Sequence, residues 1–130
     1  MSVAALLLTA CGPGEPSSAT LGLCDEVPDA IAEMERMRDR LEGGAFAANV
    51  TDVVVATHDL LEPMYAEARR AVGSEDYEPY EQVGAFVQGA WLAYVEMDTV
   101  DARPGYLSYT ESISRLRRAE QACDELDEHL

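Results

Sequence analysis

The chain has 130 residues, with 9 basic and 25 acidic side chains and a formal net charge of −16. One domain is the expectation for this length, and a hydrophobic content of 48% argues against a disordered protein. Every basic residue is an arginine. So acidic a chain repels the phosphates of nucleic acids, and this excludes nucleic acid as a partner.

The chain opens with an apolar segment that ends in small residues and a cysteine. Residues 1–10 contain three consecutive leucines, as in the apolar part of an export signal. Leu8, Thr9, Ala10 and Cys11 resemble the lipobox of bacterial lipoproteins, in which leucine lies three places before the cysteine and small residues fill the gap. The resemblance implies that a peptidase removes residues 1–10 and that Cys11 carries diacylglyceryl chains such as palmitate.

The same resemblance implies a location for the protein. Two acyl chains, at about 0.8 kcal/mol per buried methylene, hold a protein on a membrane durably. We therefore expect a lipid-anchored protein of the cell envelope, on the extracytoplasmic side. No positive charge precedes Cys11, so we also expect the true start codon to lie upstream. The alternative is a buried helix that happens to end in cysteine.

A segment rich in glycine, proline and serine follows Cys11. Residues 12–20 have a composition that buries little apolar area. We therefore predict three parts: a signal peptide over 1–10, a lipidated cysteine and flexible tether over 11–23, and a helical domain over 24–130.

Two further cysteines, Cys24 and Cys123, lie at the two ends of the expected domain. In an oxidising compartment such a pair predicts a disulfide, which would restrict the unfolded chain by up to ~4.7 kcal/mol in the entropic account. Two buried free thiols are an alternative. A metal pair is less favoured, because neither cysteine has a second ligand at metal-binding spacing.

Apolar residues recur every three or four places throughout the domain, which predicts helices. The first two are expected at 28–42, with Pro28 in the first turn, and from about 49 to Gly73, kinked at Pro63. The residues predicted to face the core are Ile31, Met34, Met37 or Arg38, and Leu41 in the first helix, and Val50, Val54, Thr57, Leu61, Tyr65, Ala68 and Val72 in the second.

The third helix is expected from Pro79 to Met97 and the fourth from about Tyr106 to the frayed C-terminus. Their predicted core residues are Tyr80, Val83, Val87, Ala90, Tyr94 and Met97, and Tyr106, Tyr109, Ile113, Leu116, Ala119, Cys123 and Leu126. Small residues at 85, 89 and 93 suggest either a close approach of a neighbouring helix or chance. The fold class is all-α, an up-down-up-down four-helix bundle closed by one disulfide.

Candidate groups for catalysis or metal binding are scarce. His58, Glu62 and Tyr65 have the helical spacing of metal ligands, but His129 is the one other histidine. We expect His58 to lie at the edge of the core, bonded to Glu62. With both domain cysteines paired, no nucleophile stands beside an oriented base. We predict no enzyme activity, no metal and no cofactor.

Aromatic residues gather around the third helix and the start of the fourth. Such side chains are favoured in binding surfaces because each combines a large apolar area with a polar tip. The candidate binding surface consists of Tyr77, Tyr80, Trp91, Tyr94, Tyr106 and Tyr109, of which we expect half to be core. A basic run, Arg115, Arg117 and Arg118, is expected to be solvated, with a docking patch as the alternative.

The leading hypothesis for function is a non-catalytic lipoprotein, anchored to the membrane through Cys11, whose acidic helical domain binds a protein or an envelope component. One alternative is a small-ligand or cation carrier, with a pocket near His58, Tyr65 and Trp91. Another is a prophage-type exclusion or defence lipoprotein, which shares size and location with this chain.

Overall fold

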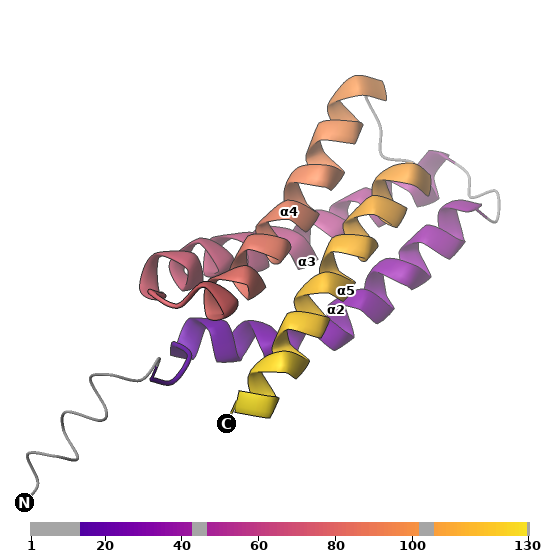
Figure 1. Cartoon of the computed structure of the whole chain (residues 1–130). Coiled ribbons are helices and arrows are strands. Elements are labelled where there is room, and N and C mark those ends of the chain that lie inside the picture. Colours follow the sequence, from indigo (N-terminus) through magenta and orange to yellow (C-terminus); the bar gives the residue numbers. More distant parts are fainter. Residues whose placement is uncertain (1–13, 43–46, 102–105, 130) are drawn as a thin grey trace, which may run out of the picture.

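The computed structural model describes the backbone of residues 14–42, 47–101 and 106–129, and the side chains of residues 14–41, 51–96 and 108–126. It contains four helices in these ranges: α2 (Ser18–Glu42), α3 (Ala47–Ser74), α4 (Glu78–Asp101) and α5 (Tyr106–His129). Consecutive helices run in opposite directions, so the start of α2, the α3–α4 turn and the end of α5 lie at one end (Figure 1). The predicted all-α, up-down-up-down bundle is confirmed.

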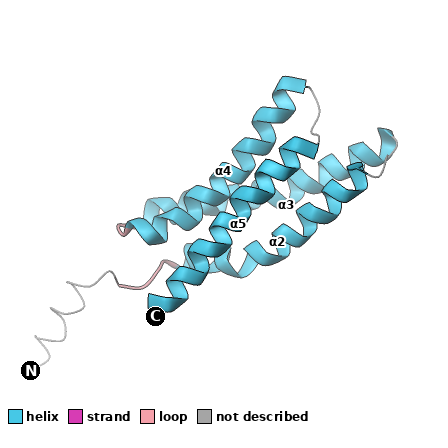
Figure 2. Ribbon diagram, turned by 45° about the vertical axis from the view of Figure 1, so that its right-hand side comes forward, coloured by secondary structure: helices cyan, strands magenta, loops and turns pink. Residues whose placement is uncertain are grey.

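Each helix contacts its two neighbours around the bundle, and α2 also contacts α4 across it. The described residues lie in helices and short connections throughout (Figure 2). Full burial of one large apolar side chain contributes about 1.5–3 kcal/mol. The largest buried side chains include Tyr80, Tyr94, Tyr109, Leu23, Met34, Leu61, Leu116 and Leu126.

Among the described side chains, the predicted core faces of α4 and α5 are confirmed, and that of α2 is confirmed except for Leu41, which is half-buried. The face of α3 is shifted. We expected Val54, Tyr65 and Val72 to be buried, and these three are half-buried instead. The buried residues of α3 are Val53, Thr57, Leu61, Met64, Ala68 and Ala71. Because residues 53–55 are all valine, the sequence allows either Val53 or Val54 to face the core. Packing against the neighbouring helices buries Val53.

The first helix begins ten residues earlier than expected, at Ser18 instead of Pro28. Ser17 is its N-cap, because the Ser17 Oγ accepts a hydrogen bond from the Thr20 N–H at 3.2 Å. The Ser17 carbonyl accepts from the Leu21 N–H at 3.0 Å. The prediction of a flexible tether through residue 23 is therefore wrong for residues 18–23, which are helical. Cys11 itself lies outside the described residues.

Two prolines lie inside helices, Pro28 in α2 and Pro63 in α3. A proline has no N–H to donate to the carbonyl four residues earlier, and its ring crowds that carbonyl. The first turns of α2 are set at an angle to the rest of the helix in both views (Figures 1 and 2), as expected for a proline within a helix. At Pro63 the helix continues, so the expectation that this proline does not break α3 is confirmed.

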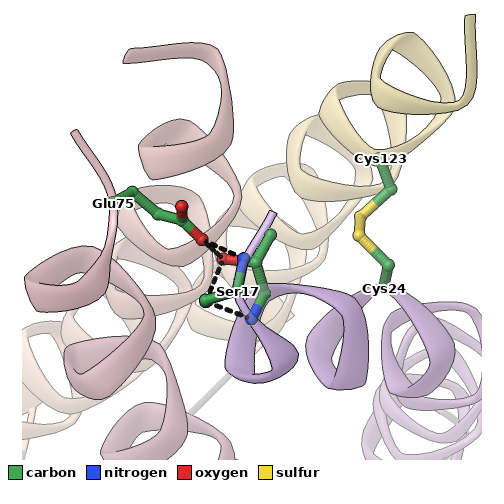
Figure 3. The surroundings of a disulfide bond; sticks show 5 residues. Ser17, Cys24, Glu75 and Cys123 are labelled. Atoms are coloured by element: carbon green, nitrogen blue, oxygen red, sulfur yellow. Dashed lines mark hydrogen bonds between the residues drawn. A yellow bond between two sulfur atoms is a disulfide. The ribbon is translucent and has the colours of Figure 1, made fainter. Parts of the chain in front are cut away.

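The predicted disulfide is confirmed. Cys24 of α2 and Cys123 of α5 are bonded, with their Cα atoms 5.6 Å apart and 99 residues between them in sequence. The bond links the first helix to the last at the end of the bundle that also holds the α3–α4 turn (Figure 3).

Helices α3 and α4 approach each other closely at Gly84, which is buried. A Cβ added at Gly84 would lie 2.8 Å from the carbonyl oxygen of Ala68 and 2.9 Å from a methyl group of Val72. Position 84, which is not in the strip at 85, 89 and 93, is therefore a point of close approach between the two helices. At Gly89 an added Cβ would meet the movable end of the Arg115 side chain.

The disulfide gives a first prediction. Reduction, or the pair Cys24→Ser and Cys123→Ser, should lower the melting temperature while leaving helicity at low temperature nearly unchanged. The reason is that the bond mainly restricts the unfolded chain, by up to ~4.7 kcal/mol in the entropic account. Thermal melts followed by circular dichroism measure this. In a Cys11→Ser background, detection of free thiol in the oxidised protein would contradict the pairing.

A second prediction concerns Gly84. Gly84→Ala should lower the free energy of unfolding by about 1–2 kcal/mol, because the new methyl group pushes against the backbone of α3. The matched control is Gly22→Ala in α2, where an added Cβ meets nothing within 4 Å. That change should stabilise the protein by up to about 1 kcal/mol through helix propensity. Equal effects of the two changes in denaturant titrations would show that α3 and α4 are not in close contact at Gly84.

Candidate functional site

Residues 14–17, which precede α2, are bound to the α3–α4 end of the bundle. The Tyr80 hydroxyl donates to the Gly14 carbonyl at 2.8 Å. The Glu75 carboxylate accepts from the Ser17 N–H at 2.8 Å and from the Thr20 hydroxyl at 2.5 Å (Figure 3). We call these bonds the N-terminal contact. They fix the backbone from residue 14 onward to the folded domain.

The electrostatics of the N-terminal contact keep Tyr80 in its neutral form. Burial, followed by the nearby Tyr77, Glu75 and Glu15, raises the pKa of the Tyr80 hydroxyl above its ordinary value. The neutral hydroxyl is the form that can donate to the Gly14 carbonyl. The stability that Tyr80 contributes is therefore present below pH ~10 and is lost as the pH rises through the raised pKa.

The predicted aromatic binding surface is largely core. Tyr80, Tyr94 and Tyr109 are at most 2% exposed, so these three cannot line an exposed surface. Tyr77 and Trp91 are half-buried. Tyr106 begins α5, and its side chain lies outside the described ones. The aromatic residues therefore contribute mainly to stability, and the expectation that half are core holds.

His58 lies at the edge of the core, as predicted, but it contacts aromatic rings instead of Glu62. Its ring meets Trp91 edge-on at 5.2 Å and Tyr94 at 5.3 Å between centroids. Tyr65 lies 6.1 Å from the Trp91 ring on the same cluster. The residues of the expected ligand pocket are therefore brought together, but their rings pack on one another.

The core contains a buried hydroxyl group, that of Thr57. The Thr57 Oγ1 lies 2.6 Å from the Tyr109 hydroxyl and 2.7 Å from the Val53 carbonyl oxygen. The Met37 sulfur is 3.3 Å from the Thr57 Oγ1. These bonds satisfy a hydroxyl that would be costly to bury alone. Met37 is therefore a core residue that pairs with α3.

An open groove lies between α2 and α3, with a volume of about 350 Å³. Its floor is apolar and consists of Ala30, Leu60, Pro63 and Met64, and its rim is acidic and consists of Asp25, Glu26, Asp29, Glu33 and Asp59. We call this feature the acidic groove. It has the mixture of apolar and charged lining that is typical of binding sites.

The groove continues across α3 into a second hollow lined by His58, Asp59, Glu62, Pro63 and Ala66. Asp59 and Pro63 line both. Because Pro63 has no N–H, it leaves the carbonyl of Asp59 without the helical donor that other residues supply. The side chain of Asp59 is exposed, so its carboxylate is available to a partner in either hollow.

Arginines gather on the other side of the bundle. Arg117 pairs with Glu35 of α2, Arg115 with Glu111 at 3.1 Å, and Arg118 lies over the ring of Phe86. Two grooves lie beside α5. The arginines that line one of them are Arg38, Arg117 and Arg118. Arg118 also lines the other, together with polar and apolar side chains of α4 and α5. This agrees with the interpretation of the basic run as a face with local pairs.

The described residues meet neither the requirements of a metal site nor those of a membrane span. Among them no three His, Cys, Asp or Glu side chains come close enough together to hold a metal ion. None of the described helices has the length and apolarity that a membrane span requires. The acidic groove combines an apolar floor with three carboxylates, those of Asp25, Asp29 and Asp59, that form no ion pair with a described side chain.

Comparison with known proteins gives no relative: no family model, no curated sequence and no solved structure matches the chain.

Sequence reasoning missed the acidic groove and the N-terminal contact. The signal for the groove was the row Asp25, Asp29 and Glu33, spaced by four on one face of α2. The signal for the contact was Ser17 as an N-cap three residues before Thr20. The N-cap was overlooked because residues 11–23 were predicted to be a flexible tether. The acidic row was overlooked because the chain has 25 acidic residues.

The N-terminal contact gives a third prediction. Glu75→Ala should lower the free energy of unfolding by about 1–3 kcal/mol, because it leaves the Ser17 N–H and the buried Thr20 hydroxyl without their acceptor. Hydrogen exchange at residues 17–21 should accelerate. Asp76→Ala removes the same charge from an exposed neighbour and is the matched control. Equal exchange in the two variants would contradict the role of Glu75.

Proposed function

We propose that the protein is a lipoprotein of the cell envelope, anchored through Cys11 on the extracytoplasmic side, whose helical domain binds another protein without catalysing a reaction. The observation that carries the proposal is the disulfide between Cys24 and Cys123, which lies downstream of the lipobox-like sequence. Disulfides persist in oxidising compartments outside the cytoplasm. The bond and the lipobox resemblance thus support the same location independently.

The N-terminal contact gives this anchor a consequence. Three peptide units join Cys11 to Gly14, and an extended chain of that length spans at most about 11 Å. A lipid on Cys11 would therefore hold the end of the bundle with Glu75 and Tyr80 close to the bilayer. The domain would stand on the membrane surface instead of moving on a long tether.

The proposal of a binding role is supported by what the described surface offers. The acidic groove supplies apolar floor and negative charge, which suit recognition of a protein. The buried hydroxyls of Tyr109 and Thr57 are satisfied by structural bonds, and His58 is packed between rings. The polar groups of the core therefore serve the fold.

A fourth prediction tests the anchor. Cys11→Ser should move the protein from the detergent phase to the aqueous fraction and should abolish incorporation of labelled fatty acid, because the thiol that would carry the lipid is gone. Phase partitioning and metabolic labelling in the native host measure this. The matched control is Thr9→Ser, which keeps a small residue beside the cysteine and should leave labelling intact. Absence of label in the unchanged protein would refute the anchor.

A further inference from the structure

We propose that the acidic groove docks a basic amphipathic helix of a partner protein. The helix would place apolar side chains on the floor between α2 and α3, and arginine or lysine side chains along the rim. This inference names the partner class for the binding role proposed above, and it rests on that role but not on the lipid anchor.

The floor of the groove suits a helix. Ala30 and Met64 are buried at its base, Leu60 is half-buried, and Pro63 is exposed. Two adjacent helices present a furrow between them into which the side-chain ridge of a third helix fits. An amphipathic helix laid in such a furrow is a recurrent mode of peptide recognition, with anchors at intervals of three and four residues.

The rim supplies the charge pattern. Asp25, Asp29 and Glu33 form a row with four-residue spacing on α2, so successive members are about 6 Å apart along the helix. Basic residues at the same interval on a partner helix would match this row. Asp59 stands on the opposite wall, on α3, and would meet the other flank of the partner.

Most of the rim carboxylates have no partner of opposite charge among the described side chains. Glu33 pairs with Arg36, but Asp25, Asp29 and Asp59 form no ion pair with any described side chain. Their mutual repulsion is relieved when positive charge arrives, which gives both specificity and fast association. An anionic lipid or nucleic acid would meet the opposite effect.

The carboxylates of the rim are spaced apart, so they suit a partner with several separated positive charges better than a single metal ion. No three of the described acidic, histidine or cysteine side chains converge as a metal site requires. A second copy of the chain is disfavoured by its own charge of −16. An extended cationic helix satisfies both the apolar floor and the separated acids.

The test uses the full chain with Cys11→Ser and a synthetic helix with leucine on one face and lysine on the other. Titration calorimetry should detect binding. The same peptide with scrambled order, which has no apolar face, should bind at least about tenfold more weakly, a loss of about 1.4 kcal/mol. Equal affinity of the two peptides would overturn the proposal, because it would mean attraction without docking.

Two variants with equal charge locate the binding surface. Asp25→Asn, Asp29→Asn and Asp59→Asn together should weaken binding by about tenfold or more. The control, Glu120→Gln, Asp124→Asn and Glu125→Gln on α5, also removes three negative charges and should have little effect. If both variants weakened peptide binding equally, the peptide would be attracted by the net charge of the protein, and the proposal that it docks in the acidic groove would be refuted.

A third variant tests the floor without altering charge. Leu60→Ser should weaken binding, because it removes apolar contact from a half-buried position, while thermal melts verify that the fold is retained. Unchanged affinity would overturn apolar docking.

Analytical ultracentrifugation tests whether a second copy of the chain occupies the groove instead. If the unchanged protein self-associates and the triple asparagine variant does not, the groove binds a second copy. Because the chain used here lacks the anchor, failure of these tests leaves the lipidation experiment unaffected.

Discussion

The bond between Cys24 and Cys123 is the constraint around which the rest of the structure is arranged. It joins the first helix to the last, so α2 is held in the ring of helices although its first turns bend away near a proline. The same turns carry Ser17 and Thr20, which reach the α3–α4 turn through Glu75. Covalent closure and the N-terminal contact thus fix one end of the bundle, where a lipid on Cys11 would attach.

Helix positions and most core faces could be predicted because burial imposes a period on the sequence. The face of α4 from Tyr80 to Tyr94 has one continuous apolar frame, and the structure uses it. In α3 the run of three valines at 53–55 allowed two choices of buried face, and only contact with the neighbouring helices α2 and α4 distinguishes them. Thr57 lies on both faces, so the choice of face alone does not reveal its bond with Tyr109. That bond depends on a partner 52 residues away that periodicity does not identify.

The N-terminal segment and the groove show the other limit of sequence reasoning. Residues 14–17 have the composition of a linker, yet Glu75, 58 residues beyond Ser17, holds them on the domain. Likewise, 25 acidic residues are too many for any pair to be informative. Only the packing shows that arginines neutralise acids beside α5, while Asp25, Asp29 and Asp59 form no ion pair with a described side chain. Tertiary contacts therefore decide which of many similar residues form the candidate site.

The proposed anchor and the proposed docking groove constrain each other. Asp25 follows the disulfide residue Cys24 directly, so the groove begins near the end of the bundle that a lipid would hold at the membrane. A partner helix seated there would lie within reach of the bilayer, where any anionic headgroups would attract its basic residues. The acidic rim would compete with the headgroups for the same helix. Its apolar floor, together with Asp59 on α3, would favour transfer of the helix to the protein, because a flat charged surface lacks both features.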